Sequence, residues 1–478
     1  PSNWAQVSAC FDRLDQEIAD PGVDLERWLL AGSELGAAIA EERDRRYVAM
    51  TSRPDDPEAE KRFLEFVQDL DPKMKPRWDA LNRAYLAHPR RAALDRARWG
   101  IYDRSAENDA ALFRAENVPL EAEEEQLQQR YNRVAGAQTA VVRGEERTIA
   151  RLEGLLEEQD RVLRLEAWEA IAARRRQDGD ACDEIYDRLV DLRGRMAKNA
   201  GCAGYREYMF RRRERFDYGP EQCFAFHRAV EKTVVPRIRA LDAERKRRLG
   251  VESLRPWDLS VDPKNEPPLR PFTEASRLYD GCRAMFARVH PEFAEWLEAI
   301  HARGFLDLEN RKGKAPGGYQ ISLEATRFPF IFMNATGTNR DVITLLHEGG
   351  HAFHYLLVRD EPVLRYRSPP IEFCEVASMG MELLAQRELD VFYDPAAARR
   401  ARLRHLDRVL HIFPGVATID AFQHWVYGHP GHTRDQRTRA WRELTERFGG
   451  LEDWSGYEIA RDVSWQRIHH LYTHPFYF

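Results

Sequence analysis

The chain of 478 residues contains few cysteines, no long apolar run and no excess of positive charge. Its six cysteines are scattered and form no CxxC pair, a pattern typical of free thiols in a reducing compartment. No run approaches about 18 apolar residues, so no transmembrane helix is predicted. The formal net charge is −6 at pH 7 with both signs interspersed, which argues against nucleic-acid binding because such proteins usually carry a net basic patch.

The first residues, PSNWAQVSACFDRLDQEIAD, contain no basic segment followed by an apolar core. A secretory signal peptide is therefore not predicted. Together with the free thiols, this favours a cytoplasmic location.

Helical patterns dominate what the chain does contain. Hydrophobic residues make up 43% and aromatic residues 11% of it, enough to bury a substantial core. Long charged segments with helical spacing, such as PEAEKRFLEFVQDL, run to about residue 135, and ACDEIYDRLVDLRGRMAKNAG ends at a glycine suited to a helix C-cap. We place a boundary between two regions near residue 200.

β-structure is predicted in two places. Two short β-prone runs flank Gly144 in TAVVRGEERTIARL, which predicts a small hairpin. Residues 319–323 and 328–333 are bounded by Gly, Pro and Asn and read as strands. These two strands come directly before the segment DVITLLHEGGHAFHYLL.

That segment combines a helical pattern with two histidines and a glutamate. Its apolar residues recur with the spacing of one helix face, and Thr338 and Asn339 lie upstream as candidate N-caps. His347 and His351 are one turn apart, so both imidazoles point into one space and can chelate Zn²⁺. Glu348 lies close enough to take a proton from a water on that metal, which is the logic of an HExxH motif.

A zinc site needs a third protein ligand, and the predicted helix in PPIEFCEVASMGMELLAQREL offers three glutamates. Glu375 and Glu382 share a helix face, and Glu372 lies a turn before Glu375. The spacing slightly favours Glu375, which small residues flank. Glu372 and Glu382 stay open as alternatives, and His354 is a further candidate because it lies one turn beyond His351.

Two adjacent glycines, Gly349 and Gly350, occupy the middle of the HEGGH helix, where each costs about 1 kcal/mol relative to alanine. A helix that delivers a carboxylate to the same ion must approach closely, and glycines remove the side chains that would block it. We therefore predict that both glycines make room for the helix that carries Glu375.

These segments resemble the zinc oligopeptidase family that includes thimet oligopeptidase and oligoendopeptidase F. The resemblance covers about residue 195 to the C-terminus and is carried by DVITLLHEGGHAFH, EFCEVASMGMELL, AKNAGCAGYREYMFRRRERFDYGPEQC, GGYQISL, PFIFMNATGT, FPGVATIDAFQHWVY and IHHLYTHPFY. It implies a mainly α, two-lobed helical metallopeptidase with a small β-sheet next to the HEGGH helix and a deep central channel. Residues 1–200 would form an N-terminal helical lobe, and residues 201–478 a catalytic zinc-peptidase lobe that ends early relative to the family.

The resemblance also implies roles for individual residues. One Zn²⁺ per chain would be held by His347, His351 and Glu375, and Glu348 would be the general base. In the family a histidine near the C-terminus contacts the substrate and helps to stabilise the oxyanion, and His470 matches it best.

Family tyrosines near the C-terminus act beside that histidine. Tyr477 is our candidate for this phenol, with Tyr472 as the alternative. Asp341 is expected either to orient a metal ligand or to face solvent at the start of its helix. His469 and His474 are expected to be structural or to face solvent.

The function implied is hydrolysis of internal bonds in short peptides by a zinc-dependent oligoendopeptidase, with no nucleic acid or membrane as partner and an unassigned oligomeric state. We expect the strand at 328–333 to pair with an extended substrate. One alternative is a zinc peptidyl-dipeptidase or carboxypeptidase, in which Arg461 or Arg467 would hold the terminal carboxylate. The other is a non-catalytic peptide-binding relative.

A second group of histidines lies in HWVYGHPGH, at His424, His429 and His432. Three histidines suggest a second metal site, but the glycines and proline of this stretch favour a helix that ends in a loop. We therefore expect no second site from these three residues.

Overall fold

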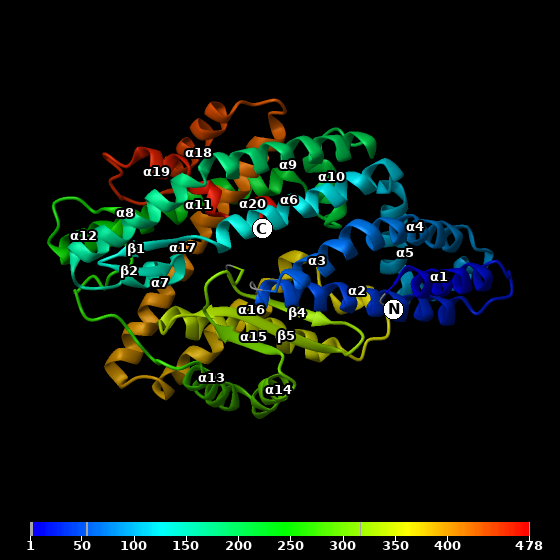
Figure 1. The fold of residues 1–478 in the computed structure, drawn as a ribbon, viewed down its shortest axis with the longest axis horizontal. Helices are drawn as coiled ribbons and strands as arrows, with labels where there is room; N and C mark the ends of the chain where they lie inside the picture. The colour runs from blue at the N-terminus through cyan, green and yellow to red at the C-terminus, as the bar shows by residue number, and fades with distance from the viewer. Residues whose placement is uncertain (1–2, 54–55, 316, 478) are drawn as a thin grey trace.

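The computed structural model describes residues 3–53, 56–315 and 317–477, and Phe478, at which the sequence ends, lies outside this part. The mainly helical fold that the sequence predicts is confirmed (Figure 1). The first helices are α1 (Trp4–Ile18), α2 (Leu25–Ser52), α3 (Pro57–Glu65), α4 (Asp71–Ala87), α5 (Arg96–Leu112) and α6 (Val118–Gly136).

A hairpin and six further helices come next along the chain. They are β1 (Thr139–Val142), β2 (Glu145–Thr148), α7 (Ile149–Leu155), α8 (Arg161–Gln177), α9 (Gly179–Asn199), α10 (Tyr205–Arg212), α11 (Pro220–Thr233) and α12 (Val235–Leu249). The last part consists of α13 (Ala275–Val289), α14 (Pro291–Ala302), β3 (Leu306–Glu309), β4 (Tyr319–Leu323), β5 (Phe328–Ala335), α15 (Asn339–Val358), α16 (Ile371–Ala385), α17 (Pro395–Gly428), α18 (Arg434–Phe448), α19 (Glu458–Asp462) and α20 (His469–Thr473).

Two bodies face each other in Figure 1. The lower body holds α13 to α16 and the sheet of β4 and β5, to which β3 belongs, whereas α6, α8 to α12 and α18 to α20 form the upper one. The long helix α17 joins them: Ala398 and Ala401 pack in the core of the lower body, and Phe422 and Val426 pack in the core of the upper body. The two-lobed architecture is therefore as predicted.

The upper body combines segments that lie far apart in the sequence. Leu192 and Met196 of α9 share a buried cluster with Phe476, and Tyr186 shares another with Phe422. Helices on both sides of residue 200 are thus packed together, and the division of the chain at that residue stays a prediction.

Local sequence explains why α15 forms despite its glycines. Thr338 is its N-cap, and Asp341 completes a capping box in which its Oδ2 accepts hydrogen bonds from the Thr338 backbone N–H and hydroxyl. Asp341 is buried, so neither expectation for it is met: it stabilises the helix start instead of facing solvent or orienting a metal ligand. The predicted apolar face is buried, as Leu345 and Phe353 show.

The sheet beside α15 has the strand order β3-β5-β4. β5 is central and pairs with β3 in parallel and with β4 antiparallel. The prediction that the strand at 328–333 pairs with substrate is therefore wrong, because both of its edges are occupied. The sequence also missed β3, whose four residues LDLE are too short and too polar to stand out as a strand.

Two turn signals in the sequence are confirmed. β1 and β2 form the predicted antiparallel hairpin, and its turn places Arg143 and Gly144 at φ +51° and +83°. Positive φ at both positions is typical of a tight two-residue hairpin turn. Gly201 follows α9 at φ +74°, as expected of a glycine that ends a helix.

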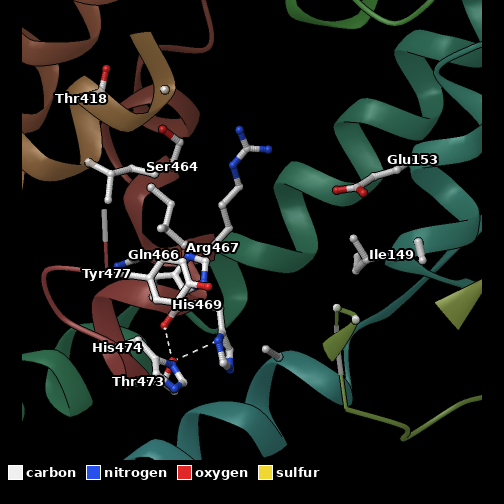
Figure 2. A pocket seen from close by; sticks show the side chains of 18 of the residues that line it. Ile149, Glu153, Thr418, Ser464, Gln466, Arg467, His469, Thr473, His474 and Tyr477 are labelled. Atoms are coloured by element: carbon white, nitrogen blue, oxygen red, sulfur yellow. Dashed lines mark hydrogen bonds between the residues drawn. The ribbon is translucent and has the colours of Figure 1, made fainter. Parts of the chain in front are cut away.

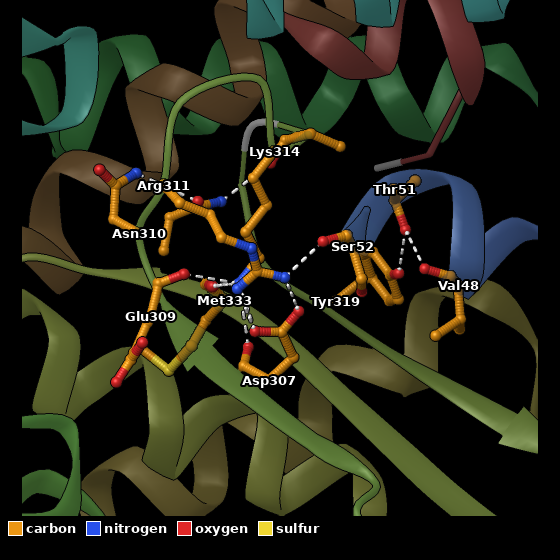
Figure 3. A network of polar contacts seen from close by, with 12 residues as sticks. Val48, Thr51, Ser52, Asp307, Glu309, Asn310, Arg311, Lys314, Tyr319 and Met333 are labelled. Carbon is orange, nitrogen blue, oxygen red and sulfur yellow. Dashed lines mark hydrogen bonds and ion pairs between the residues drawn. The ribbon is translucent and has the colours of Figure 1, made fainter. Parts of the chain in front are cut away.

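Two positively charged side chains, Lys314 and Arg311, anchor the segment between β3 and β4 (Figure 3). The buried ammonium of Lys314 donates to the carbonyl oxygens of Glu309 and Met333 and to Asp307 Oδ1, at 2.6–2.9 Å. Arg311 binds Asp307 and the carbonyl of Ser52 at the end of α2. These contacts fix the approach to strand β4.

Two predicted absences are consistent with the described residues. All six cysteines are free, as the sequence predicts. Within the described part of the chain, no helix is both long and apolar enough to cross a bilayer.

Candidate metal centre

Helices α15 and α16 bring together the three predicted metal ligands. Glu375 Oε2 lies 3.1 Å from His347 Nε2 and 3.8 Å from His351 Nε2. One ligand atom from each residue lies within 4.8 Å of the other two. The imidazole rings are nearly perpendicular, at 85°, with centroids 4.8 Å apart, so they approach one point from different directions.

The donor set fits a zinc ion. Zinc binds imidazole nitrogen and carboxylate oxygen at about 2.0–2.2 Å in a tetrahedral arrangement, which puts two ligand atoms about 3.3–3.6 Å apart. The separations of 3.1 and 3.8 Å bracket that value. Three protein donors leave one position of a tetrahedral ion open, as in catalytic sites.

The alternatives weighed for the third ligand lie elsewhere. Glu372 accepts hydrogen bonds from Arg215 and Tyr218. Glu382 faces the other nitrogen of the first histidine and accepts a 2.6 Å hydrogen bond from His347 Nδ1. His354 is not among the grouped donor atoms of the described residues.

The two glycines make room for two different neighbours, one in α16 and one in α13. A Cβ on Gly350 would lie 2.6 Å from Ser378 Cα and 2.7 Å from Ala377 O, both backbone atoms of α16. The prediction that glycine makes room for the helix of Glu375 is therefore confirmed for Gly350. It is wrong for Gly349, whose Cβ would lie 2.5 Å from the Phe286 ring of α13, because adjacent helix positions point about 100° apart.

Charges at the site are coupled. Burial lowers the pKa of His347, but hydrogen bonds with Glu375 and Glu382 outweigh burial and raise it to about 10. Burial raises the pKa of Glu375, yet the bond with His347 outweighs it and lowers the pKa to about 2. Burial lowers the pKa of His351 to about 4. In the metal-free chain, a proton on His347 thus supplies the positive charge that the carboxylates face.

Glu348 is buried beside these donors, with a side chain on the cavity wall. Burial raises its pKa to about 7, far above that of an ordinary glutamate. A Cβ on Gly318, just before β4, would come within 3.2 Å of its Oε1, so this glycine leaves space for the carboxylate. A carboxylate with a pKa near neutrality is suited to move protons in both directions.

Sequence reasoning missed the role of Glu382. Its two oxygens contact His347 Nδ1 at 2.6 Å and His405 Nε2 at 3.4 Å, so it connects α16 to both α15 and α17. A carboxylate on the outer nitrogen of a metal-binding histidine fixes the tautomer and orients the ring. The signal was present in the sequence, since Glu382 shares a helix face with Glu375.

The C-terminal segment reaches the same centre. Tyr477 donates a hydrogen bond of 2.6 Å to Glu375 Oε1, and the His470 ring stacks on the Tyr477 ring at 4.5 Å. Tyr472 is fully buried and stacks on Tyr131, away from the donors. Of the two tyrosines left open, only Tyr477 lies at the centre.

A cavity of about 2040 Å³ separates the two bodies, and the metal centre lies on its wall. Figure 2 shows Ile149 and Glu153 on one side and Arg467, His469 and Tyr477 on another. His469 and His474 line this cavity and also hydrogen-bond within the protein, to Asn132 and Thr473 respectively. Arg461 is engaged in ion pairs with Glu446 and Asp462.

The three histidines of HWVYGHPGH do not converge. The ring nitrogens Nδ1 of His429 and His432 bond to the carbonyl oxygens of Trp425 and His429. His424 lies in the core of the upper body, where it is 4% exposed. Among the described residues, His424 is not grouped with His429 or His432 as a set of metal donors.

Comparisons with known proteins relate the chain to peptidases. The family description "Peptidase family M3" matches residues 154–478. Oligoendopeptidase F, chromosomal, of Lactococcus lactis subsp. cremoris is 25% identical over 239 residues, 49% of this chain and 39% of that protein. Oligopeptidase PepF of Bacillus subtilis is 24% identical over 315 residues, 61% of this chain and 45% of that protein. The matched parts thus span less than half the length of both curated relatives.

Solved structures are similar over almost the whole chain. A PZ peptidase A with inhibitor 2 has a TM-score of 0.94 and 29% identity, covering 100% of this chain and 85% of that one. An oligoendopeptidase-F from Enterococcus faecium has a TM-score of 0.55 and 14% identity, covering 99% and 83%, and supports the fold alone.

Proposed function

The chain belongs to peptidase family M3, and on that basis we propose that it is a zinc-dependent oligoendopeptidase that hydrolyses internal bonds of short peptides. The observation that carries the proposal is the convergence of His347, His351 and Glu375 beside Glu348 on the wall of a large cavity. His347, His351 and Glu375 would hold one Zn²⁺. When bound, zinc supplies a Lewis acid and lowers the pKa of water at its open position.

Side chains of the protein transfer the proton of the attacking water and stabilise the negative charge that develops on the substrate. Glu348 takes the proton from the attacking water and returns it to the leaving nitrogen, a task for which its pKa of about 7 suits it. The Tyr477 hydroxyl and the His470 ring, stacked together at the centre, donate hydrogen bonds to the oxyanion of the substrate. Without substrate the Tyr477 hydroxyl donates to Glu375 and is held at the centre. Because this hydroxyl carries one proton, it gives up that bond when it donates to the oxyanion.

Strand β4, and not the central strand β5, offers an edge for substrate binding. β4 forms an edge of its three-stranded sheet, and its residues Tyr319, Gln320 and Ile321 line the cavity. An extended peptide can pair with the free edge of a strand through main-chain hydrogen bonds. The anchors at Lys314 and Arg311 hold this edge in place before the peptide arrives.

The test is mass spectrometry of peptides of mixed length after incubation with the zinc-loaded chain. The pool contains each peptide with a free and with an amidated C-terminus. The proposal expects internal cuts in both forms, lost on chelation and restored by zinc. Removal of C-terminal residues from the free form alone would favour the carboxypeptidase or dipeptidase alternative, with Arg467 of the cavity as the anchor. No cuts by a chain that retains zinc would favour the non-catalytic peptide-binding alternative.

A further inference from the structure

A second cluster of metal-binding residue types lies where α11 meets α17 in the upper body. Cys223 and His227 are one turn apart on α11, and Asp420 and His424 are one turn apart on α17. Residues four apart share a helix face, so the two pairs face each other across the helix contact. None of these four residues lies among the groups of the first centre.

The distances within this cluster are those of metal ligands. One ligand atom from each of Cys223, Asp420 and His424 lies within 4.8 Å of the other two. His424 Nε2 is 3.4 Å from Asp420 Oδ2, the separation of two ligands of one tetrahedral ion. His227 Nε2 is 2.8 Å from the same oxygen and holds the carboxylate in place.

Buried polar atoms at this point make no hydrogen bond among the residues that the structure describes. His424 and Asp420 are each 4% exposed. Neither ring nitrogen of His424 makes a hydrogen bond there, and neither does Asp420 Oδ1. Leaving such atoms unsatisfied is costly, and most buried polar atoms in native proteins are paired. A bound cation would satisfy a nitrogen and an oxygen together.

The surroundings suit a structural ion with limited access. The ring centroids of Phe224 and Phe476 lie 4.8 and 5.2 Å from that of His424 and enclose it in apolar groups. A small surface cavity of about 190 Å³ opens onto Cys223 and Asp420 and provides a path for an ion. The nearby cation Arg215 is bonded to Glu372.

We propose that Cys223, Asp420 and His424 bind a second divalent metal ion, with His227 as the group that orients Asp420. Thiolate sulfur, imidazole nitrogen and carboxylate oxygen are the three ligand types of zinc, which therefore fits best. The ion would fasten α11 to α17. Gln423, next to His424 on α17, accepts a 2.5 Å hydrogen bond from the backbone N–H of Phe476. An ion that holds α17 in place would therefore also support the segment that carries Tyr477.

The experiment uses Co²⁺ as the probe, because cobalt bound by a thiolate gives an intense near-ultraviolet charge-transfer absorption that nitrogen and oxygen ligands do not give. The metal-free chain is titrated with Co²⁺, and bound metal is counted after removal of free ions. The proposal expects about two ions per chain and a thiolate absorption that saturates with one of them. The three donors grouped at the first centre, His347, His351 and Glu375, include no sulfur.

Variants assign the absorption to the residues. Cys223→Ala, whose side chain is only half buried, should lose the thiolate absorption and one bound ion while the other remains. Cys374→Ala is the matched control, because Cys374 lies beside Glu375 and is the cysteine that could ligate at the first centre. His347→Ala should retain the thiolate absorption. One ion per chain with no thiolate absorption, or an absorption lost in Cys374→Ala instead, would overturn the proposal and leave the cluster as a polar contact between two helices.

Discussion

Replacing Gly350 by alanine should weaken the metal centre by moving a helix. The new Cβ would lie 2.6 Å from Ser378 Cα and 2.7 Å from Ala377 O, closer than real Cβ contacts allow. Because the nearest atoms belong to the backbone of α16, relief requires that helix to shift. Ser378 also donates a 2.8 Å hydrogen bond to Glu375 Oε2, so the shift is passed directly to the ligand.

The expected magnitudes follow from the geometry. Ordinary contact needs about 3.4 Å or more, so α16 must withdraw by about 0.8 Å at this point. Overpacking of this kind costs about 1–3 kcal/mol, against which alanine regains about 1 kcal/mol of helix propensity. The net loss of stability is therefore only ~0–2 kcal/mol. Metal ligands tolerate displacements of about 0.2 Å, so we expect zinc affinity to fall at least ~10-fold.

Competition with a chromogenic chelator measures the zinc affinity, and urea unfolding of the metal-free chain measures the stability. Gly380→Ala is the matched control, since Gly380 lies on α16 and a Cβ there would meet no atom within 4 Å. It should gain up to ~1 kcal/mol of stability and bind zinc normally. Unchanged zinc affinity in Gly350→Ala, or an equal loss in Gly380→Ala, would refute the reasoning.

Three further predictions concern the same site and one distant acid. Glu382→Gln should lower zinc affinity by ~10–100-fold in chelator competition, because the carboxylate that orients His347 through Nδ1 is lost. Tyr477→Phe keeps the ring stacked on His470 but removes the hydroxyl, so kcat should fall ~10²–10³-fold with zinc content unchanged. Burial raises the pKa of Asp44 to about 6, so its ionisation destabilises the folded chain as pH rises from about 4 through 6. Asp44→Asn removes this loss and should raise the free energy of unfolding of the metal-free protein by up to ~3 kcal/mol more at pH 8 than at pH 4. An equal effect at both pH values would contradict this.

Much of the fold was accessible from local patterns. The helix of HEGGH and its Thr338 cap follow from residue spacing and side-chain chemistry within a few positions. The hairpin at Gly144 is fixed by a two-residue turn in the same way. Such features depend on residues that are neighbours in the sequence, so a single amino-acid sequence is enough to predict them.

The errors concern partners that are distant in sequence. Nothing near 328–333 shows that β3 will pair with this strand and occupy its edge, because that pairing depends on a short polar segment about twenty residues earlier. The neighbour of Gly349 is likewise set by α13, whose Phe286 is some sixty residues away. Asp341 was misjudged because a capping acid and a solvent-facing acid have the same sequence pattern.

At the candidate site, too, local spacing predicts some residues and contacts between distant helices decide the others. The donors His347, His351 and Glu375 were picked from spacing together with the family resemblance, and the structure brings their ligand atoms together. The contact between Glu382 and His405 joins helices α16 and α17, and no spacing rule predicts it. The pairing of α11 with α17, on which the second metal proposal rests, was equally out of reach of the sequence.

The central claim is that the ligand carboxylate and the proton-transferring carboxylate have separate tasks. We would measure zinc content and peptide turnover in Glu375→Gln and Glu348→Gln, alongside the unaltered chain. The account predicts that Glu348→Gln keeps its zinc at the first centre and loses turnover by at least ~10²-fold, whereas Glu375→Gln loses both. Full turnover in Glu348→Gln, or normal zinc binding in Glu375→Gln, would contradict the account.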